Sequence, residues 1–403
     1  MADLLTVGAL FAAIAVVSIL AARLGTSVIP LYIVTGMLVS PTVAGELVIA
    51  GTDVPAIQTG EFVEIGAELG IVFLLFFLGL EFNLERLVAD RARIVSAGTI
   101  DLLVNFTAGL AVGYLLFGTP LAAFLVAGIV YISSSAIITK SLIDLGWIAN
   151  DEAAPLLGTL VFEDLAIAVY LAIAVALVAG GSGVAGLATS VGLALGFIVL
   201  LLLVVQFGSE AFERLLEGTS NEFLVLRAVG VTVLVAGVAL AIGVSEAVAA
   251  FFVGMAFAST SHVERLERLL EPVRDVFAAI FFVWIGLETD PMLVMEVAAF
   301  VAIAVVATTP TKLVSGYLGG RAYDLGPRRS TRVGLGMVTR GEFSLIIAAV
   351  ALEGAGGTLS AAVAGDLYSF AVGYVLAMSV LGTVLMQYSA PFERFAVERF
   401  GTE

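Results

Sequence analysis

The stretch YISSSAIITK, residues 131–140, places three consecutive hydroxyl side chains inside an otherwise apolar run. A second apolar run, GMVTRGEFSLII at residues 336–347, is interrupted in the same way by Thr339, Arg340 and Glu342. Each stretch alone is ordinary, because serine can bond back to its own helix and glycine lets helices pack closely. If both helices unwind here, their half-helix ends become available, with carbonyls that face a cation and amides that face an anion.

The composition indicates that most of the chain lies in a lipid bilayer and not in water. The 403 residues are 61% hydrophobic and only 13% charged, with a mean hydropathy of +1.13, so a soluble domain of this length is excluded. Apolar runs of about 20 residues are long enough to cross a bilayer as helices. The alternating pattern of a transmembrane β-barrel is absent. We therefore expect an all-α membrane protein.

Charge and residue usage exclude several other classes. The net charge of −16 disfavours nucleic-acid binding, and the lack of cysteine excludes thiol chemistry. The sequence holds no metal-ligand cluster, no phosphate-binding glycine loop and no Ser-His-Asp arrangement in a plausible context. We expect neither an enzyme nor a cofactor.

Breaks between the apolar runs predict about thirteen transmembrane helices. They fall at residues 3–22, 28–40, 62–82, 94–117, 120–143, 153–179, 185–207, 222–242, 244–260, 273–288, 292–320, 330–354 and 364–388. Arginine is found after the odd-numbered spans and not after the even-numbered ones. After the fifth span, Lys140 is the only basic residue nearby. Because cytoplasmic loops collect basic residues, the alternation predicts an outside N-terminus and a cytoplasmic C-terminus. The first span is predicted to be retained and not cleaved as a signal peptide.

Two halves of the sequence resemble each other. The Gly-Met pair at Gly36 recurs at Gly254, and the Gly-Leu-Glu triplet at Gly79 recurs at Gly286, 207 residues later. The same separation relates Asn105 to Lys312, and it relates SSSA (133–136) to RGEF (340–343). The halves are seven spans apart, so they have opposite topology, as in the inverted repeats of secondary transporters. We therefore expect two crossed broken helices, lined by Ser133, Ser134, Ser135, Thr339, Arg340 and Glu342, where Arg340 and Glu342 neutralise the helix-dipole ends.

The run TLVFEDLAIAVY, residues 159–170, contains two adjacent acids, Glu163 and Asp164. Acids within a membrane are costly and normally face a cavity or a partner. Adjacent residues on a helix point about 100° apart, so these two cannot share one role. We assign Asp164 to a water-accessible cavity and Glu163 to a neighbouring helix that carries Lys312, although the two assignments could be exchanged.

This arrangement favours competition between a proton and a monovalent cation for one binding site. Burial opposes the charged form of a carboxylate, so Asp164 can hold a proton or a monovalent cation, but not both well. If the site changes sides only when one guest is bound, the two flows are coupled as exchange. Lys312 adds a second protonation switch if cation binding breaks its bridge to Glu163. The alternative is a fixed buried ion pair that joins two spans. Asp101 and Asn105 either line the same cavity or satisfy the broken helices.

Several motifs, in order, resemble the monovalent cation:proton antiporter superfamily. They include FFLGLEFNLERL (76–87), YISSSAIITKSLIDLG (131–146), LVFEDLAIAV (160–169), the long stretch from SEAVAAFF at residue 245, and VTRGEFSLI (338–346). The branch with most resemblance contains Kef-type potassium-efflux antiporters and thirteen-span sodium/proton antiporters.

The resemblance implies a division of labour along the chain. A mobile core with two crossed broken helices would span about 94–179 and 292–388, beside dimerisation or scaffold helices at about 1–82 and 222–288. Asp164 matches the ion-binding aspartate, Glu163 the position before it, and Lys312 the basic residue of sodium/proton members. The glutamate at 163 leaves the charge moved per cycle open. The nucleotide-binding regulatory domain of Kef-type proteins is not expected here, and a separate subunit could supply regulation.

We expect a homodimeric antiporter of the plasma membrane that exchanges Na⁺, or K⁺, for protons by alternating access. Sodium is preferred, because an acid–lysine pair fits the sodium-type members. The only metal expected at Asp164 is this transported monovalent cation. A gated monovalent cation channel and a non-transporting membrane receptor or scaffold remain as alternatives. Saturable exchange without unitary current would favour the antiporter over the channel.

Overall fold

A computed structural model of the chain describes residues 4–24, 28–44, 48–49, 52–53, 57, 59–80, 91–180, 220–241 and 246–400, with residues 192, 196, 199–200, 203 and 212–214. Within these residues the regular structure is helical, apart from an antiparallel hairpin of β1 (Val48–Ile49) and β2 (Thr52–Asp53). The predicted all-α fold class is confirmed. Of the predicted span at 185–207, only the five residues from 192 to 203 named above are described.

Contacts divide the chain into two compact units. The first unit contains residues 1–83 and 171–291, and the second contains residues 84–170 and 292–403. Each unit therefore takes one stretch from each half of the sequence.

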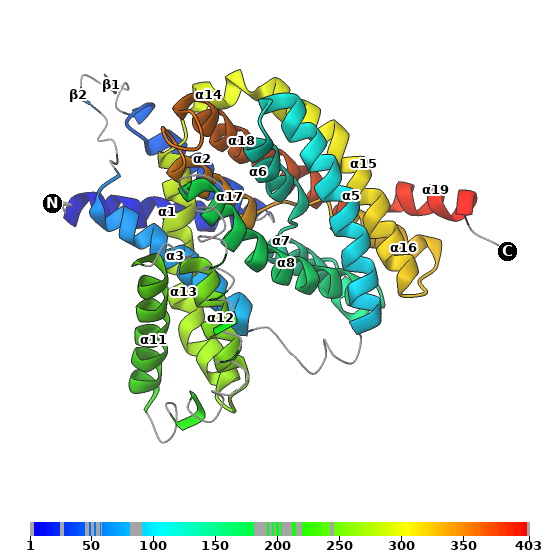
Figure 1. The fold of residues 1–403 in the computed structure, drawn as a ribbon, viewed down its shortest axis with the longest axis horizontal. Helices are drawn as coiled ribbons and strands as arrows, with labels where there is room; N and C mark the ends of the chain where they lie inside the picture. The colour runs from blue at the N-terminus through cyan, green and yellow to red at the C-terminus, as the bar shows by residue number, and fades with distance from the viewer. Residues whose placement is uncertain are drawn as a thin grey trace. The chain divides into compact units, whose positions relative to one another are not determined.

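The first unit is a helical bundle around α3. Its helices are α1 (Leu4–Leu24), α2 (Ile29–Val39), α3 (Glu61–Leu80), α11 (Asn221–Ala241), α12 (Glu246–Ala258) and α13 (Val263–Leu287). α3 packs against both α12 and α13, and α13 packs in turn against α2 (Figure 1). These contacts bury apolar side chains such as Phe76, Phe251 and Phe281 completely.

Two glycine crossings in this unit show the repeat directly. A Cβ added at Gly36 would lie 2.8 Å from the Cα of Gly286, and one added at Gly79 would lie 2.9 Å from the Cα of Gly254. Backbones approach this closely only where both side chains are absent. The sequence repeat pairs Gly36 with Gly254 and Gly79 with Gly286. The symmetry of the repeat therefore relates the Gly36–Gly286 crossing to the Gly79–Gly254 crossing.

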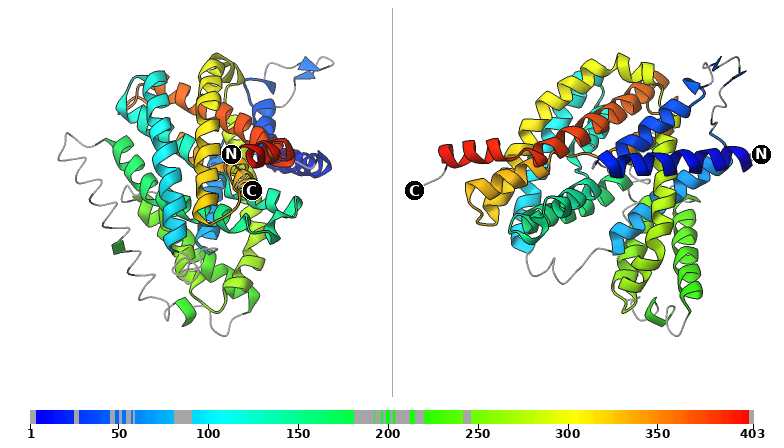
Figure 2. Two further views of the ribbon diagram at one scale, coloured as in Figure 1. Left: turned by 90° about the vertical axis from the view of Figure 1, so that its right-hand side faces the viewer. Right: turned by 180° about the vertical axis from the view of Figure 1, so that it is seen from behind.

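The second unit holds the remaining helices of the described residues. They are α5 (Arg91–Phe117), α6 (Pro120–Tyr131), α7 (Ser135–Asp144), the short η2 (Trp147–Ala149), α8 (Ala153–Ala179, in this unit as far as Tyr170), α14 (Pro291–Glu296, from Met292), α15 (Ala298–Ala322), α16 (Pro327–Gly336), α17 (Glu342–Glu353), α18 (Ala361–Gln387) and α19 (Ala390–Phe400). α15 lies beside both α5 and α16 (Figure 2).

The helix boundaries of this unit follow the repeat. α5 and α15 begin at Arg91 and Ala298, 207 residues apart, and α7 and α17 begin at Ser135 and Glu342, again 207 residues apart. α6 and α16 both begin with proline at the first helical position, where its missing N–H has no cost. The predicted inverted repeat is therefore present in the fold.

Close helix packing repeats at the same separation. A Cβ at Gly109 of α5 would lie 2.7 Å from the Cα of Ala127 in α6. A Cβ at Gly316 of α15 would lie 2.7 Å from the Cα of Gly334 in α16. Each continuous helix thus holds the first half of a broken helix at short range.

The two predicted breaks are present and they cross. Residues 132–134 separate α6 from α7, and residues 337–341 separate α16 from α17. The backbone N–H of Ser134 in one break donates to the carbonyl of Thr339 in the other at 3.2 Å. A side chain on Gly341 would meet the Ser134 hydroxyl, so the crossing requires a residue without Cβ.

Among the described residues, seven helices are long and apolar enough to cross a bilayer. Four shorter apolar segments of 10–17 residues accompany them: Ile29–Val39, Pro120–Tyr131, Glu246–Ala258 and Phe343–Glu353. Two of the four are halves of the broken helices, which explains their length. The chain is a multi-pass membrane protein, and the count of thirteen spans stays a prediction.

Ion pairs hold the last helix, α19, to α16, which is the first half of a broken helix. Glu393 of α19 accepts from Arg328 at 2.6 Å and from Arg332 at 2.7 Å, both on α16, and from Ser389 at 2.8 Å. Arg332 also donates to Glu152 at 2.6 Å, just before α8. Burial opposes ionisation of Glu393, but the bonds from Arg332, Arg328 and Ser389 outweigh it and lower the pKa of Glu393 below its usual value. The N-terminal end of α16 is thereby held to α19 and to the start of α8.

Candidate ion site at the crossed broken helices

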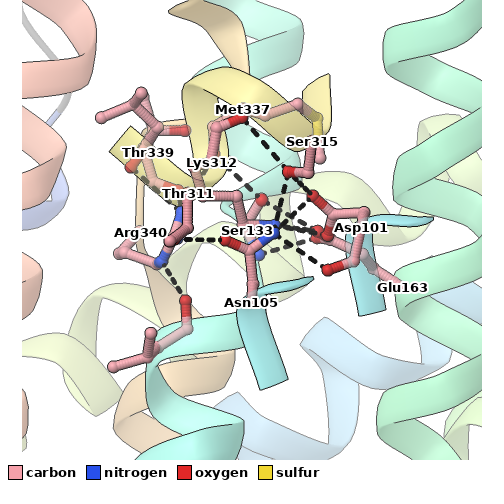
Figure 3. Close-up of polar contacts among 12 residues, drawn as sticks. Asp101, Asn105, Ser133, Glu163, Thr311, Lys312, Ser315, Met337, Thr339 and Arg340 are labelled. Carbon is pink, nitrogen blue, oxygen red and sulfur yellow. Dashed lines mark hydrogen bonds and ion pairs between the residues drawn. The ribbon is translucent and has the colours of Figure 1, made fainter. Parts of the chain in front are cut away.

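The centre of the second unit is a lysine held between two acids. Lys312 of α15 is fully buried, and its Nζ lies 2.6 Å from Asp101 Oδ2 of α5 and 2.6 Å from Glu163 Oε1 of α8 (Figure 3). The ring of Tyr131, the last residue of α6, has its centroid 5.3 Å from the same ammonium. Buried charges must be paired and hydrogen-bonded. One ammonium group here lies between two carboxyl groups.

The second oxygen of Asp101 has its own donors. Its Oδ1 accepts from Asn105 Nδ2 at 2.9 Å and from Ser315 Oγ at 2.7 Å. Asn105 Nδ2 also donates to Ser315 Oγ, and Thr311 Oγ1 donates to Asn105 Oδ1 at 2.9 Å. The backbone carbonyl and Oδ1 of Asp101 can only accept, so they fix which way the Asn105 amide points. Asp101 and Asn105 thus join α5 to α15 around the lysine.

Glu163 connects the lysine to the first helix break. The backbone N–H of Ser133 donates to Glu163 Oε2 at 2.7 Å, and the Ser133 hydroxyl donates to Oε1 at 3.0 Å. The same hydroxyl lies 3.3 Å from the carbonyl of Met337 in the second break. A carboxylate at the unwound start of α7 also faces the positive end of that half-helix. Glu163 is therefore bound to both the lysine and the unwound backbone.

The three consecutive serines have three different roles. Ser133 binds Glu163, as above. Ser134 accepts from the backbone N–H of Ile137 at 3.3 Å, as an N-cap of α7 does. Ser135 donates to Asp164 Oδ1 at 3.5 Å, the long limit for such a bond. Both Asp164 and Glu163 are buried, but Glu163 binds Lys312 and Ser133 whereas Asp164 contacts Ser135, so the two adjacent acids have different partners.

Arg340 closes the crossing of the two breaks. Its Nε donates to the carbonyl of Val130 at 2.8 Å, and its Nη1 lies 2.9–3.0 Å from the carbonyls of Met337, Val338 and Thr339 (Figure 3). These carbonyls belong to the ends of α6 and α16, where the helix dipoles are negative and intrahelical partners are missing. The position of Arg340 is the one that the sequence argument expects. The side chain of Glu342 lies outside the described residues.

The structure collects most of the residues that the sequence singles out. Asp101, Asn105, Ser133, Glu163 and Lys312 form one hydrogen-bonded network, and Glu163 contacts Lys312 as the sequence leads us to expect. Asp164 contacts Ser135 beside that network. Arg340 and Thr339 lie in the second break, next to it.

Four contributors are absent from the sequence argument. Thr311 and Ser315 flank Lys312 on the same helix, so small polar residues around a membrane-depth lysine are the signal that could have found them. Tyr131 begins the stretch YISSSAIITK itself. Ser344 donates to the carbonyl of Ile129 at 2.8 Å, a bond that only the crossing of α6 and α17 brings about.

The chemistry of this arrangement suits one small cation. Carboxylate and hydroxyl oxygens are hard ligands that suit alkali cations, and a carboxylate can equally hold a proton. Among the described residues, no group of three or more His, Cys, Asp or Glu side chains could hold a metal ion.

Comparison with known proteins places the chain among transporters. The family model for the transmembrane sodium/hydrogen exchanger matches residues 9–387. The K⁺/H⁺ antiporter subunit KhtU of Bacillus subtilis is 36% identical over 384 residues, which cover 95% of this chain and 92% of KhtU. The ammonium/H⁺ antiporter subunit AmhT of Alkalihalophilus pseudofirmus is 28% identical over 348 residues, 85% of each chain.

A solved structure has the same fold. The sodium proton antiporter MjNhaP1 of Methanocaldococcus jannaschii superposes with a TM-score of 0.72 over 98% of this chain and 99% of that one. The two sequences are only 15% identical, so the likeness concerns the fold alone.

Proposed function

The chain belongs to the sodium/hydrogen exchanger family, and we propose that it is a secondary antiporter that exchanges a monovalent cation for protons. The observation that carries the proposal is Asp164, an almost fully buried acid beside Ser135 where α7 begins. A proton and a cation both neutralise such an acid, and each excludes the other. Competition at Asp164 couples the two flows.

The division into two units supports alternating access by movement of the second unit. This unit carries the crossed breaks and all of the polar network, and it overlaps the proposed core at about 94–179 and 292–388 except for residues 171–179. The first unit supplies the scaffold and the contacts of a homodimer. We place the protein in the plasma membrane, with the N-terminus outside and the C-terminus in the cytoplasm, because arginine follows the odd-numbered spans.

Two features bear on the substrate and on regulation. A Glu163–Lys312 pair resembles the acid–lysine pair of the sodium-type members, while KhtU is named for K⁺, so both ions belong in one assay. KhtU and AmhT are each named as a subunit, which supports a separate regulatory subunit for this chain as well.

The test is exchange by the purified protein in proteoliposomes that contain a pH indicator. Na⁺, K⁺ or Li⁺ is added outside, and movement of protons is recorded for wild type and Asp164→Asn. Wild type should dissipate a pH gradient with saturable cation dependence, and Asp164→Asn should not. Full activity in Asp164→Asn would remove the proposed carrier, and single-channel conductance in wild type would replace exchange by a channel.

A further inference from the structure

The two carboxylates that hold Lys312 have unlike surroundings. Asp101 and Glu163 lie at the same distance from the ammonium, 2.6 Å, and both are buried from solvent. An ammonium has three N–H donors, so it can bind both acids at once. What distinguishes the two acids is where their other partners lie.

Asp101 is held entirely by continuous helices. Its remaining donors are Asn105, one turn further along α5, and Ser315, one turn beyond Lys312 on α15. Thr311 of α15 locks Asn105 from its other side. None of these donors belongs to a helix break, so Asp101 is linked to the breaks only through Lys312 and through its interaction with Glu163.

Glu163 is held by the break. Its remaining donors are the N–H and hydroxyl of Ser133, and Ser133 itself lies against Met337 of the second break. The next residue, Asp164, contacts Ser135. Of the two acids that hold Lys312, Glu163 therefore shares the first break with Asp164, through Ser133 and Ser135, whereas the other partners of Asp101 do not belong to that break.

We propose that Asp101 is a positioning residue that anchors the Lys312 ammonium, so that a cation arriving at Asp164 displaces the lysine from Glu163 only. The inference rests on the proposed exchange function. Complete release of Lys312 would leave an unpaired buried charge, which is strongly unfavourable. The lysine is also a tethered monovalent cation. Without Asp101, Glu163 is the acid that still holds the Lys312 ammonium. Glu163 is next to Asp164 in the sequence, so at this position the ammonium competes with the transported ion.

The experiment measures initial rates of exchange against Na⁺ and K⁺ concentration at one pH. Asp101→Asn should raise the apparent KM for the cation by about fivefold or more, with Vmax within about twofold of wild type, because the lysine competes but does not block turnover. Asp151→Asn is the matched control. It makes the same change at an exposed acid of the second unit that pairs with Arg329, and its KM should equal that of wild type.

A double-mutant cycle separates anchoring from direct ion binding. Adding Lys312→Gln to Asp101→Asn removes the competitor, so KM should return to within about twofold of the Lys312→Gln value. A KM that stays high in the double variant would mean that Asp101 binds the cation itself and would overturn the proposal. An unchanged KM in Asp101→Asn, with Vmax lowered in proportion to folded protein, would overturn it as well.

Two further outcomes are decisive. If Asp101→Asn does not give monodisperse protein, Ser315→Ala takes its place, because it removes one bond to Asp101 Oδ1 and keeps every charge. The proposal then requires a rise of about twofold in KM that Lys312→Gln cancels, and no rise contradicts it. A wild-type protein without any exchange would overturn the proposed function, whereas a normal wild type with an unaffected Asp101 variant overturns the anchoring role alone.

Discussion

Arg340 should be the most stabilising single side chain at the crossing of the broken helices. It is fully buried and reaches four carbonyls from the ends of two half-helices, at 2.8–3.0 Å. Only three of its N–H groups serve these carbonyls, one on Nε and two on Nη1. A hydrogen bond from a charged donor contributes about 1.5–3 kcal/mol, so three at the lower end contribute about 4.5 kcal/mol, offset by about 1 kcal/mol or more because the buried Nη2 has no partner among the described residues.

Replacing Arg340 by glutamine should therefore cost about 3 kcal/mol, because the amide can still serve one or two of the carbonyls. For a unit of this size, such a loss lowers Tm by about 6–12 °C. Thermal unfolding in detergent, followed by size-exclusion chromatography after heating, measures the difference. Arg340→Lys keeps the charge but not the planar fork, and it should fall between wild type and Arg340→Gln.

Arg329→Gln is the matched control, because Arg329 lies on the same broken helix but is half exposed and pairs with Asp151 at the surface. Its second contact, to buried Glu152, is 3.6 Å long, and Glu152 keeps its shorter bond to Arg332 in this variant. A surface ion pair contributes about 0–1 kcal/mol, so its Tm should stay within about 2 °C of wild type. If Arg340→Gln were as stable as Arg329→Gln, the crossing would not depend on this guanidinium and the reasoning would be refuted.

Three other changes test separate parts of the account. Gly316→Leu should destabilise by about 3 kcal/mol or more, since its Cβ would lie 2.7 Å from the Gly334 Cα, while Gly237→Leu on α11 has open space and should unfold at the wild-type temperature. Glu163→Gln should retain exchange with an altered pH profile, because Asp101 still pairs Lys312; total loss in folded protein would count against this. Since the pKa of Glu393 is lowered, its stabilisation is complete above the ordinary carboxyl range and is lost as pH falls below about 4. Glu393→Gln should thus lower Tm at pH 7 and remove part of the acid-induced fall in Tm, and an acid limb identical to that of wild type would contradict this.

Much of the fold was predictable, because its signals are local in the sequence. Prolines 120 and 327 begin α6 and α16, and interrupted apolar runs mark both breaks. The separation of 207 residues relates the two halves without any structure. The same signals do not predict which side chains contact one another. The repeat pairs Asn105 with Lys312 as symmetry mates, but only the structure shows that Asn105 and Lys312 share Asp101.

The sequence predicted which charged residues form the site, but not which hydrogen-bond partner each of them has. Burial of a charge in an apolar run identifies Glu163, Asp164 and Lys312 from the sequence, since such residues are rare in membranes. The distribution of three serines among Glu163, the α7 cap and Asp164 depends on the path of an unwound backbone. No periodicity encodes that path, so propensity and hydropathy could not assign it.

The central claim is tested most directly by proton release from the purified protein. A lightly buffered sample in detergent with a pH indicator is mixed with NaCl or KCl, with choline chloride as the control for ionic strength. The account predicts proton release that saturates with Na⁺ or K⁺ and is absent from Asp164→Asn. Saturable cation binding by wild type without proton release, or equal release from Asp164→Asn, would contradict it.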